Sequence, residues 1–94
     1  MEMKISEFLL DASMWCQGNL AVNSNGDETR STAPDAVRWC LIGAVEVCRY
    51  TVEEHYDLIR KAEKKLGIDN VIAWQDTPGR AFRDISKLLH NIGH

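Results

Sequence analysis

The sequence has no long apolar run, no excess of positive charge and no recognisable export signal, and each absence excludes a class of protein. No stretch approaches the ~20 consecutive apolar residues that a bilayer-spanning helix needs. The 11 lysines and arginines are outnumbered by 14 acidic residues, which gives a net charge of −3. This balance argues against duplex nucleic acid, because such binding rests mainly on phosphate neutralisation. We therefore expect a cytoplasmic protein whose partner is neither a membrane nor duplex nucleic acid.

Disulfide frameworks and resident metals are also disfavoured. The three cysteines are an odd number without a short C-x-x-C spacing, whereas disulfide scaffolds use even sets and zinc sites use clustered ligands. We predict that Cys16, Cys40 and Cys48 are reduced thiols that pack as small apolar groups. The sequence contains neither a glycine-rich phosphate loop nor a G-x-S-x-G elbow. It therefore indicates no cofactor and no hydrolase of a familiar type.

Apolar residues at helical spacing are what the sequence contains instead. Its 94 residues suit a single domain over residues 1–94. Residues 5–16 are predicted to form a first helix with one apolar face. A second helix is predicted over residues 33–49, with Thr32 as its cap and Pro34 in its first turn. This second helix is apolar on nearly its whole circumference, which is typical of a helix buried by its neighbours.

A third helix has clear local boundaries in the sequence. Thr51 and Glu54 have the spacing of a capping box, and Gly67 is a natural helix end. The spacing of the apolar residues predicts an inner stripe made of Val52, Tyr56, Ile59, Ala62 and Leu66. A short helical turn follows, beginning near Asp69. These features predict a helix over most of residues 52–66.

The remaining segments complete an all-α prediction. A last helix is predicted to open at Thr77 and Pro78. Residues 19–31 are polar and centre on Asn25 and Gly26, so we expect a long loop that holds a short hairpin with a type I′ turn. In the second helix, Gly43 leaves room for the close approach of another backbone. The predicted fold is a small four-helix domain around a buried central helix.

A thiol-dependent hydrolase is the weakest of the functional hypotheses. Cys40, His55 and Asp76 occur in the order that some such enzymes use. In the predicted helices, however, Cys40 lies two turns from the helix start, where the backbone amides already have partners. A protonated His55 would be opposed by the dipole of its own helix. Cys16 is more accessible but has no evident base, so inert thiols are the better interpretation.

Metal binding is equally weak. His90 and His94 have the i, i+4 spacing of helical metal ligands, but no third ligand is close in the sequence. A faint similarity to a calcium-binding loop is carried by Asn23, Asn25, Gly26 and Asp27. Thr32 stands where such a loop needs its closing glutamate. We therefore predict no metal.

The three tryptophans leave two interpretations open. In the simpler one, Trp15, Trp39 and Trp74 are core aromatics. In the alternative, one or two of them line a pocket beside residues 19–31, with Arg30 or Arg38 as a polar partner. Such walls suit a nucleotide-like ligand and also a protein partner. The candidate ligand- or partner-binding residues are Trp15, Gln17, Asn23, Arg30, Arg38, Trp74 and Asp76.

Four pieces of the sequence form a recognisable pattern, namely Trp15-Cys16-Gln17-Gly18, residues 21–26, residues 36–44 and Trp74-Gln75-Asp76. Together they resemble a family of small bacterial and bacteriophage proteins, a domain of unknown function, over about residues 8–89. The resemblance implies a helical fold and a phage or mobile-element origin, and it implies no activity. That family has Asn before the Asp, so Gln75 bears on whether a cap or site around Asp76 is retained. We favour a helix cap for Asp76.

These observations favour a non-enzymatic binding module. The most plausible role is that of a phage or mobile-element accessory protein that contacts a host protein and inhibits or modulates it, as counter-defence proteins do. Small acidic proteins can cover a site on a larger basic partner. The alternative is a protein that binds or sequesters a nucleotide-like ligand through tryptophan and arginine side chains. Self-association through Ile85, Leu89 and Ile92 also stays open.

Overall fold

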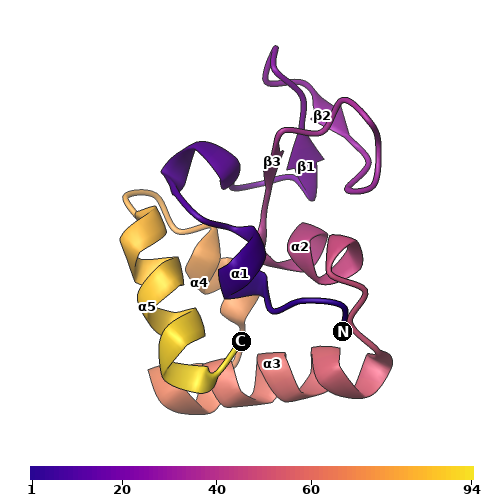
Figure 1. The fold of residues 1–94 in the computed structure, drawn as a ribbon. Helices are drawn as coiled ribbons and strands as arrows, with labels where there is room; N and C mark the ends of the chain where they lie inside the picture. Colours follow the sequence, from indigo (N-terminus) through magenta and orange to yellow (C-terminus); the bar gives the residue numbers. More distant parts are fainter.

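The computed structural model describes residues 1–94 and shows a mixed α/β fold, so the all-α prediction is wrong. A small sheet projects from a group of helices (Figure 1). In chain order the elements are α1 (Ile5–Phe8), the 3₁₀ turn η1 (Ala12–Met14), β1 (Ala21–Val22), β2 (Glu28–Thr29), β3 (Arg38–Trp39), α2 (Leu41–Val47), α3 (Val52–Leu66), α4 (Val71–Gln75) and α5 (Phe82–Ile92).

The sheet has three antiparallel strands in the order β2-β1-β3. Ala21 of the central strand pairs with Thr29 on one side and with Trp39 on the other. Both residues of β1 are buried. The hairpin predicted within residues 19–31 is confirmed as β1 and β2.

The hairpin turn differs from the type I′ turn that Asn-Gly favours. The Asn23 N–H donates to the Asp27 carbonyl and the Gly26 N–H donates to the Asn23 carbonyl, each at 2.9 Å. Gly26 has a φ of 83°, whereas a type I′ turn would also need a positive φ at Asn25, which lacks one. This pattern matches a three-residue loop that ends in a left-handed glycine.

Residues 33–40, predicted as the start of the central helix, form a turn followed by β3. Asp35 does not lie in the first turn of a helix. Its carboxylate instead accepts a hydrogen bond from Thr29 Oγ1 at 3.0 Å. The Val37 N–H donates to the Val22 carbonyl at 2.9 Å. These contacts tie the segment to the hairpin, so cross-strand pairing outweighs the local signals for a helix start.

Helix α2 therefore begins at Leu41, and Cys40 is its N-terminal cap. The Cys40 Sγ accepts a hydrogen bond from the Gly43 N–H at 3.4 Å. This corrects the placement of Cys40 two turns inside a helix. The close approach predicted at Gly43 is confirmed, because a Cβ there would lie 2.0 Å from the Leu20 carbonyl oxygen.

The first predicted helix, residues 5–16, is divided into α1 and η1. The chain leaves the helical conformation after α1, and the Asp11 carboxylate then accepts a hydrogen bond from the Ser13 N–H at 2.8 Å. Side chains of this kind compete with a continuing helix by binding nearby amides. Trp15 consequently lies in an extended segment, where it forms a parallel bridge with Trp39.

Helix α3 begins and ends where the sequence predicts. Thr51 Oγ1 accepts from the Glu54 N–H at 3.1 Å, and the Glu54 carboxylate accepts from the Thr51 N–H at 3.0 Å. Gly67 ends the helix with a φ of 69°. The capping box and the glycine end are therefore confirmed.

The predicted inner stripe of α3 is partly wrong. Ala62 is buried as expected, and Ile59 is half-buried. Val52 and Tyr56, however, are 82% and 72% exposed. Leu58, 1% exposed, takes their place in the core. The helix is thus rotated so that part of its apolar surface faces outward.

Helices α4 and α5 close the core. Helix α5 packs beside α3 (Figure 1). Ile85 and Leu89 are fully buried, so the stripe that left self-association open on the last helix completes the core instead. No helix is both long enough and apolar enough to span a bilayer.

Candidate functional site

A buried glutamine joins three distant parts of the chain. Gln75, 1% exposed, accepts hydrogen bonds through Oε1 from the Leu41 N–H at 2.6 Å and from Trp15 Nε1 at 3.3 Å. Because the first amides of a helix lack partners within it, Gln75 satisfies the start of α2 from another helix. Its Nε2 donates to Asp76 Oδ1 at 3.2 Å. Both ends of the side-chain amide are thus engaged within the chain.

Gln17 and Asp76 close the same junction. Gln17 Nε2 donates to the Gln75 carbonyl at 2.6 Å, and the Gly18 N–H donates to Asp76 Oδ1 at 3.1 Å. Asp76 therefore joins two segments, and the expectation that it caps the last helix is wrong. Of the predicted site residues, the structure brings Trp15, Gln17 and Asp76 together. They form a joint between elements rather than an open pocket.

The tryptophans are held by contacts within the chain. The Trp15 indole is bonded to Gln75, and Trp39 Nε1 donates to the Ser31 carbonyl at 2.7 Å. The Arg80 guanidinium lies 4.2 Å from the Trp74 ring centroid, a cation–π contact. All three rings are half-buried and pack against the core. These contacts favour the simpler interpretation, in which the tryptophans are structural.

Asn23, Arg30 and Arg38 lie apart from this junction. Asn23 holds the hairpin turn through its side-chain oxygen, which accepts from two amides of the turn at 3.0 Å. Arg30 follows β2 and Arg38 belongs to β3, and both are exposed. The two arginines line different hollows of the surface. The structure therefore gives no common site of arginine and tryptophan beside the hairpin.

The candidate thiol set is not assembled either. Cys40 and Asp76 line one small hollow of about 200 Å³, whereas His55 lines a groove on α3. Cys40 is 5% exposed. Burial, with a smaller contribution from Cys40, raises the pKa of the Cys16 thiol to about 11. A thiol of that pKa is protonated near neutral pH and is a weak nucleophile.

The two C-terminal histidines have separate surroundings. His94 is 4% exposed, with Nδ1 at 2.9 Å from the Tyr50 hydroxyl and Nε2 at 2.8 Å from Asp57 Oδ2. The contact with His94, and after it the contact with Lys61, lowers the pKa of Asp57. His90 is exposed and bonds a carbonyl of its own helix. The i, i+4 pair therefore does not form a shared ligand set.

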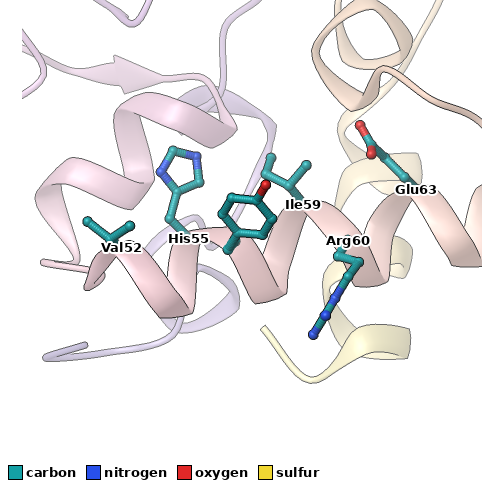
Figure 2. A pocket seen from close by; sticks show the side chains of 6 residues that line it. Val52, His55, Ile59, Arg60 and Glu63 are labelled. Atoms are coloured by element: carbon teal, nitrogen blue, oxygen red, sulfur yellow. The ribbon is translucent and has the colours of Figure 1, made fainter.

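A groove of about 470 Å³ lies along α3. Its lining side chains, called the α3 surface below, are Val52, His55, Tyr56, Ile59, Arg60 and Glu63. Residues 52, 56, 59 and 63 are spaced by four, three and four positions, so they share one helix face. In Figure 2, His55, Ile59 and Glu63 lie along one side of the helix and Arg60 points to the other.

The α3 surface combines exposed apolar groups with fixed polar ones. Val52 and Tyr56 are the two most exposed of the large apolar residues. Glu63 Oε2 accepts a hydrogen bond from the Val71 N–H at 3.2 Å, which holds this carboxylate at the rim. Arg60, one turn along the helix from Tyr56, is exposed. Such an arrangement can bind an apolar side chain of another molecule and position it with charges at the edge.

A family described as a family of unknown function (DUF6197) matches residues 5–92, nearly the whole chain. The chain belongs to this family. Neither curated proteins nor solved structures gave a match. Membership in DUF6197 assigns no reaction and no ligand, so the function must be argued from the geometry.

The sequence pattern of this DUF6197 chain did not predict the exposed apolar pair Val52 and Tyr56. Two stripes fit the periodicity of α3 almost equally well, one through Val52 and Tyr56 and another through Leu58 and Ala62. The predicted stripe drew on the first and included Ala62 from the second. The polar residues at 53, 57, 60 and 64 fit either choice, so the pattern alone does not decide the rotation. The signal available was Leu58, a large aliphatic residue that the predicted stripe leaves outside.

Proposed function

We propose that this protein is a non-enzymatic binding module and that the α3 surface contacts its partner protein. The observation that carries the proposal is the exposure of Val52 and Tyr56 on adjacent turns of a fully capped helix. Large apolar side chains at such positions are removed from water only when another molecule covers them. Covering one of them contributes roughly 1.5–3 kcal/mol to association before the costs of binding.

The residues around this apolar pair support a protein partner. Tyr56 and Arg60 belong to residue types that are enriched among the side chains that dominate interface energies. Glu63 is held in place by α4, so a partner meets it at a defined position. An apolar centre with a charged rim is the common anatomy of protein interfaces.

We further propose that the partner is a host protein and that the chain acts as a phage or mobile-element accessory protein of the counter-defence type. This part of the proposal is supported by the small size, the resemblance described above and the net charge of −3. A negative protein associates faster with a positive surface, because opposite potentials steer the encounter. We therefore expect a partner with a basic surface around an apolar cavity. Such a protein acts in the cytoplasm of the host.

The nucleotide-like ligand is less well supported. Its candidate residues are dispersed, since Arg30 and Arg38 line different hollows and the Trp15 indole is bonded to Gln75. The thiol-dependent hydrolase is weaker again, because Cys40 and His55 line separate hollows. Titration with nucleotides is expected to leave the tryptophan fluorescence unchanged, and a saturable change would revive the ligand hypothesis.

Affinity capture from host extract tests the proposal with a matched pair of variants. Tyr56→Ser removes an exposed apolar side chain from the α3 surface, and Leu10→Ser removes one that is 70% exposed elsewhere. We expect the wild type and Leu10→Ser to retain one defined polypeptide in near-stoichiometric amount. Tyr56→Ser is expected to retain it at least about tenfold less well. Equal capture by all three proteins would refute the assignment of the surface.

A further inference from the structure

The charges beside the α3 surface follow a pattern of their own. Glu53, Arg60 and Lys64 are spaced by seven and four positions, so they lie along one edge of the helix. All three are exposed, and none has an ion-pair partner within the chain. Asp57 and Lys61, further round the helix, are paired with each other at 3.1 Å. The edge beside the surface therefore carries charges that remain open to another molecule.

The sign of the charge changes along this edge. Its N-terminal end carries Glu53, and its C-terminal end carries Arg60 and Lys64. In a second copy packed parallel about a two-fold axis, this edge would lie beside the other edge of the partner helix, so its charges would not meet their own counterparts. A second copy packed antiparallel about a two-fold axis brings the same edge of both helices together, so that Glu53 of each copy faces Lys64 of the other. The chain is thus complementary to itself in one orientation.

The apolar residues fit nearly the same antiparallel packing. The face formed by residues 52, 56, 59 and 63 is symmetric about a point midway between residues 57 and 58, whereas Glu53 and Lys64 are symmetric about a point one position further along the helix. A two-fold axis that pairs Glu53 with Lys64 therefore brings Tyr56 of one copy within about 3 Å, along the helix axis, of the level of Ile59 of the other, and the contact occurs twice. Val52 lies near the rim at Glu63 with the same offset. An aromatic ring over an aliphatic side chain is a favourable cross-interface contact.

We infer that in the free protein the α3 surface is covered by α3 of a second copy, packed antiparallel with Glu53 of each chain facing Lys64 of the other. The inference rests on the proposed function, in which the α3 surface binds a host protein. It adds that the host protein must displace the second copy. The 15 residues of α3 are about 22 Å long at 1.5 Å per residue. An interface of this length lies at the small end of the known range, so we expect a weak dimer with a dissociation constant of roughly 10–100 µM.

Sedimentation equilibrium with charge-reversal variants tests the pairing. The wild type is expected to change from monomer to dimer as its concentration rises. Glu53→Lys and Lys64→Glu are each expected to raise the dissociation constant about tenfold, because each change replaces two attractions by two repulsions. An equimolar mixture of the two variants is expected to form a heterodimer, because their charges complement each other. Lys65→Glu, the same charge change about 100° further round α3 and turned away from the α3 surface, is expected to have a much smaller effect.

Three results would overturn the inference. They are a wild type that stays monomeric up to about 1 mM, a Lys65→Glu variant weakened as much as Lys64→Glu, and a mixture that fails to recover association. Far-UV circular dichroism checks that each variant is folded, and the mixture tests both variants in their folded form. A monomeric wild type that still captures a host partner through Tyr56 would refute the self-pairing alone. Loss of both self-association and host-protein capture would refute the proposed function as well.

Discussion

Gln75 shows how much a single side chain can connect in so small a protein. It satisfies donors from α2 and from the segment after η1 while lying in α4. We predict that Gln75→Ala lowers the free energy of unfolding by about 2–4 kcal/mol, because the Leu41 N–H and the Trp15 indole both lose their acceptor. Gln75→Asn, one methylene shorter, is expected to recover only part of this loss. Urea denaturation measures both, and an alanine variant as stable as the wild type would contradict the role assigned to Gln75.

A second prediction concerns Gly43, where the sign of the change in stability tests the packing. Replacing glycine by alanine inside a helix normally stabilises a protein by up to about 1 kcal/mol. In Gly43→Ala the new Cβ would lie 2.0 Å from the backbone oxygen of Leu20, which cannot move without shifting β1. We therefore predict a loss of about 1–3 kcal/mol in thermal unfolding. A more stable Gly43→Ala variant would show that α2 and the segment before β1 are not so closely packed.

Gly43 and Gln75 differ in how far their roles could be predicted from the sequence. The close approach at Gly43 was predictable, because a glycine in an apolar helix has few other uses. The role of Gln75 was not predictable, because its partners Leu41 and Trp15 are 34 and 60 residues away in the chain. Trp15, Gln17 and Asp76 were predicted as members of a candidate binding site, but not as residues that meet at Gln75. Their common function as a joint depends on that distant contact.

At the scale of elements, local signals predicted some boundaries and failed at others. The capping box of α3 is formed within four residues, so the sequence contains all of its information. Thr32, Pro34 and Asp35 suit a helix start equally well as a turn. Pairing with β1 favours the turn over the helix, because the Val22 carbonyl accepts a hydrogen bond from the Val37 N–H. The sheet was missed because its strands are two residues long and are stabilised by pairing rather than by their own pattern.

The rotation of α3 leads to an element-scale prediction. Val52→Ser and Tyr56→Ser are each expected to change the free energy of unfolding by less than about 0.5 kcal/mol, because both side chains are exposed in the free chain. Leu58→Ala, on the buried face of the same helix, is expected to cost about 2–5 kcal/mol. Chemical denaturation at low protein concentration separates the two faces. Equal costs at Tyr56 and Leu58 would place Tyr56 in the core after all.

At the scale of the whole molecule, His94 connects parts that are far apart in the chain. Its ring contacts Tyr50 and Asp57, and its carbonyl accepts a hydrogen bond from the Ser6 N–H at 2.9 Å. The end of the chain thus lies between α1 and α3 (Figure 1). This arrangement makes the stability of the molecule sensitive to the charge of Asp57.

Acid should weaken this connection in a defined direction. The contacts with His94 and Lys61 hold the pKa of Asp57 below its ordinary value, so the folded state binds a proton less readily than the unfolded chain. The stabilisation is therefore present above the ordinary aspartate pKa and is lost as the pH falls below it. We predict that the melting temperature of Asp57→Asn falls less than that of the wild type between neutral pH and pH of about 3. Parallel pH profiles would exclude this contribution.

We propose that the protein acts through the outward face of α3. The most direct test of this proposal is photocrosslinking in the host cell, with a photoreactive phenylalanine analogue placed at Tyr56 or, as a control, at Leu10. We predict discrete adducts from position 56, with a host polypeptide or with a second copy as identified by mass, and none from position 10. Adducts from position 10 alone, or none from either position, would contradict the claim that the α3 surface is the contact site.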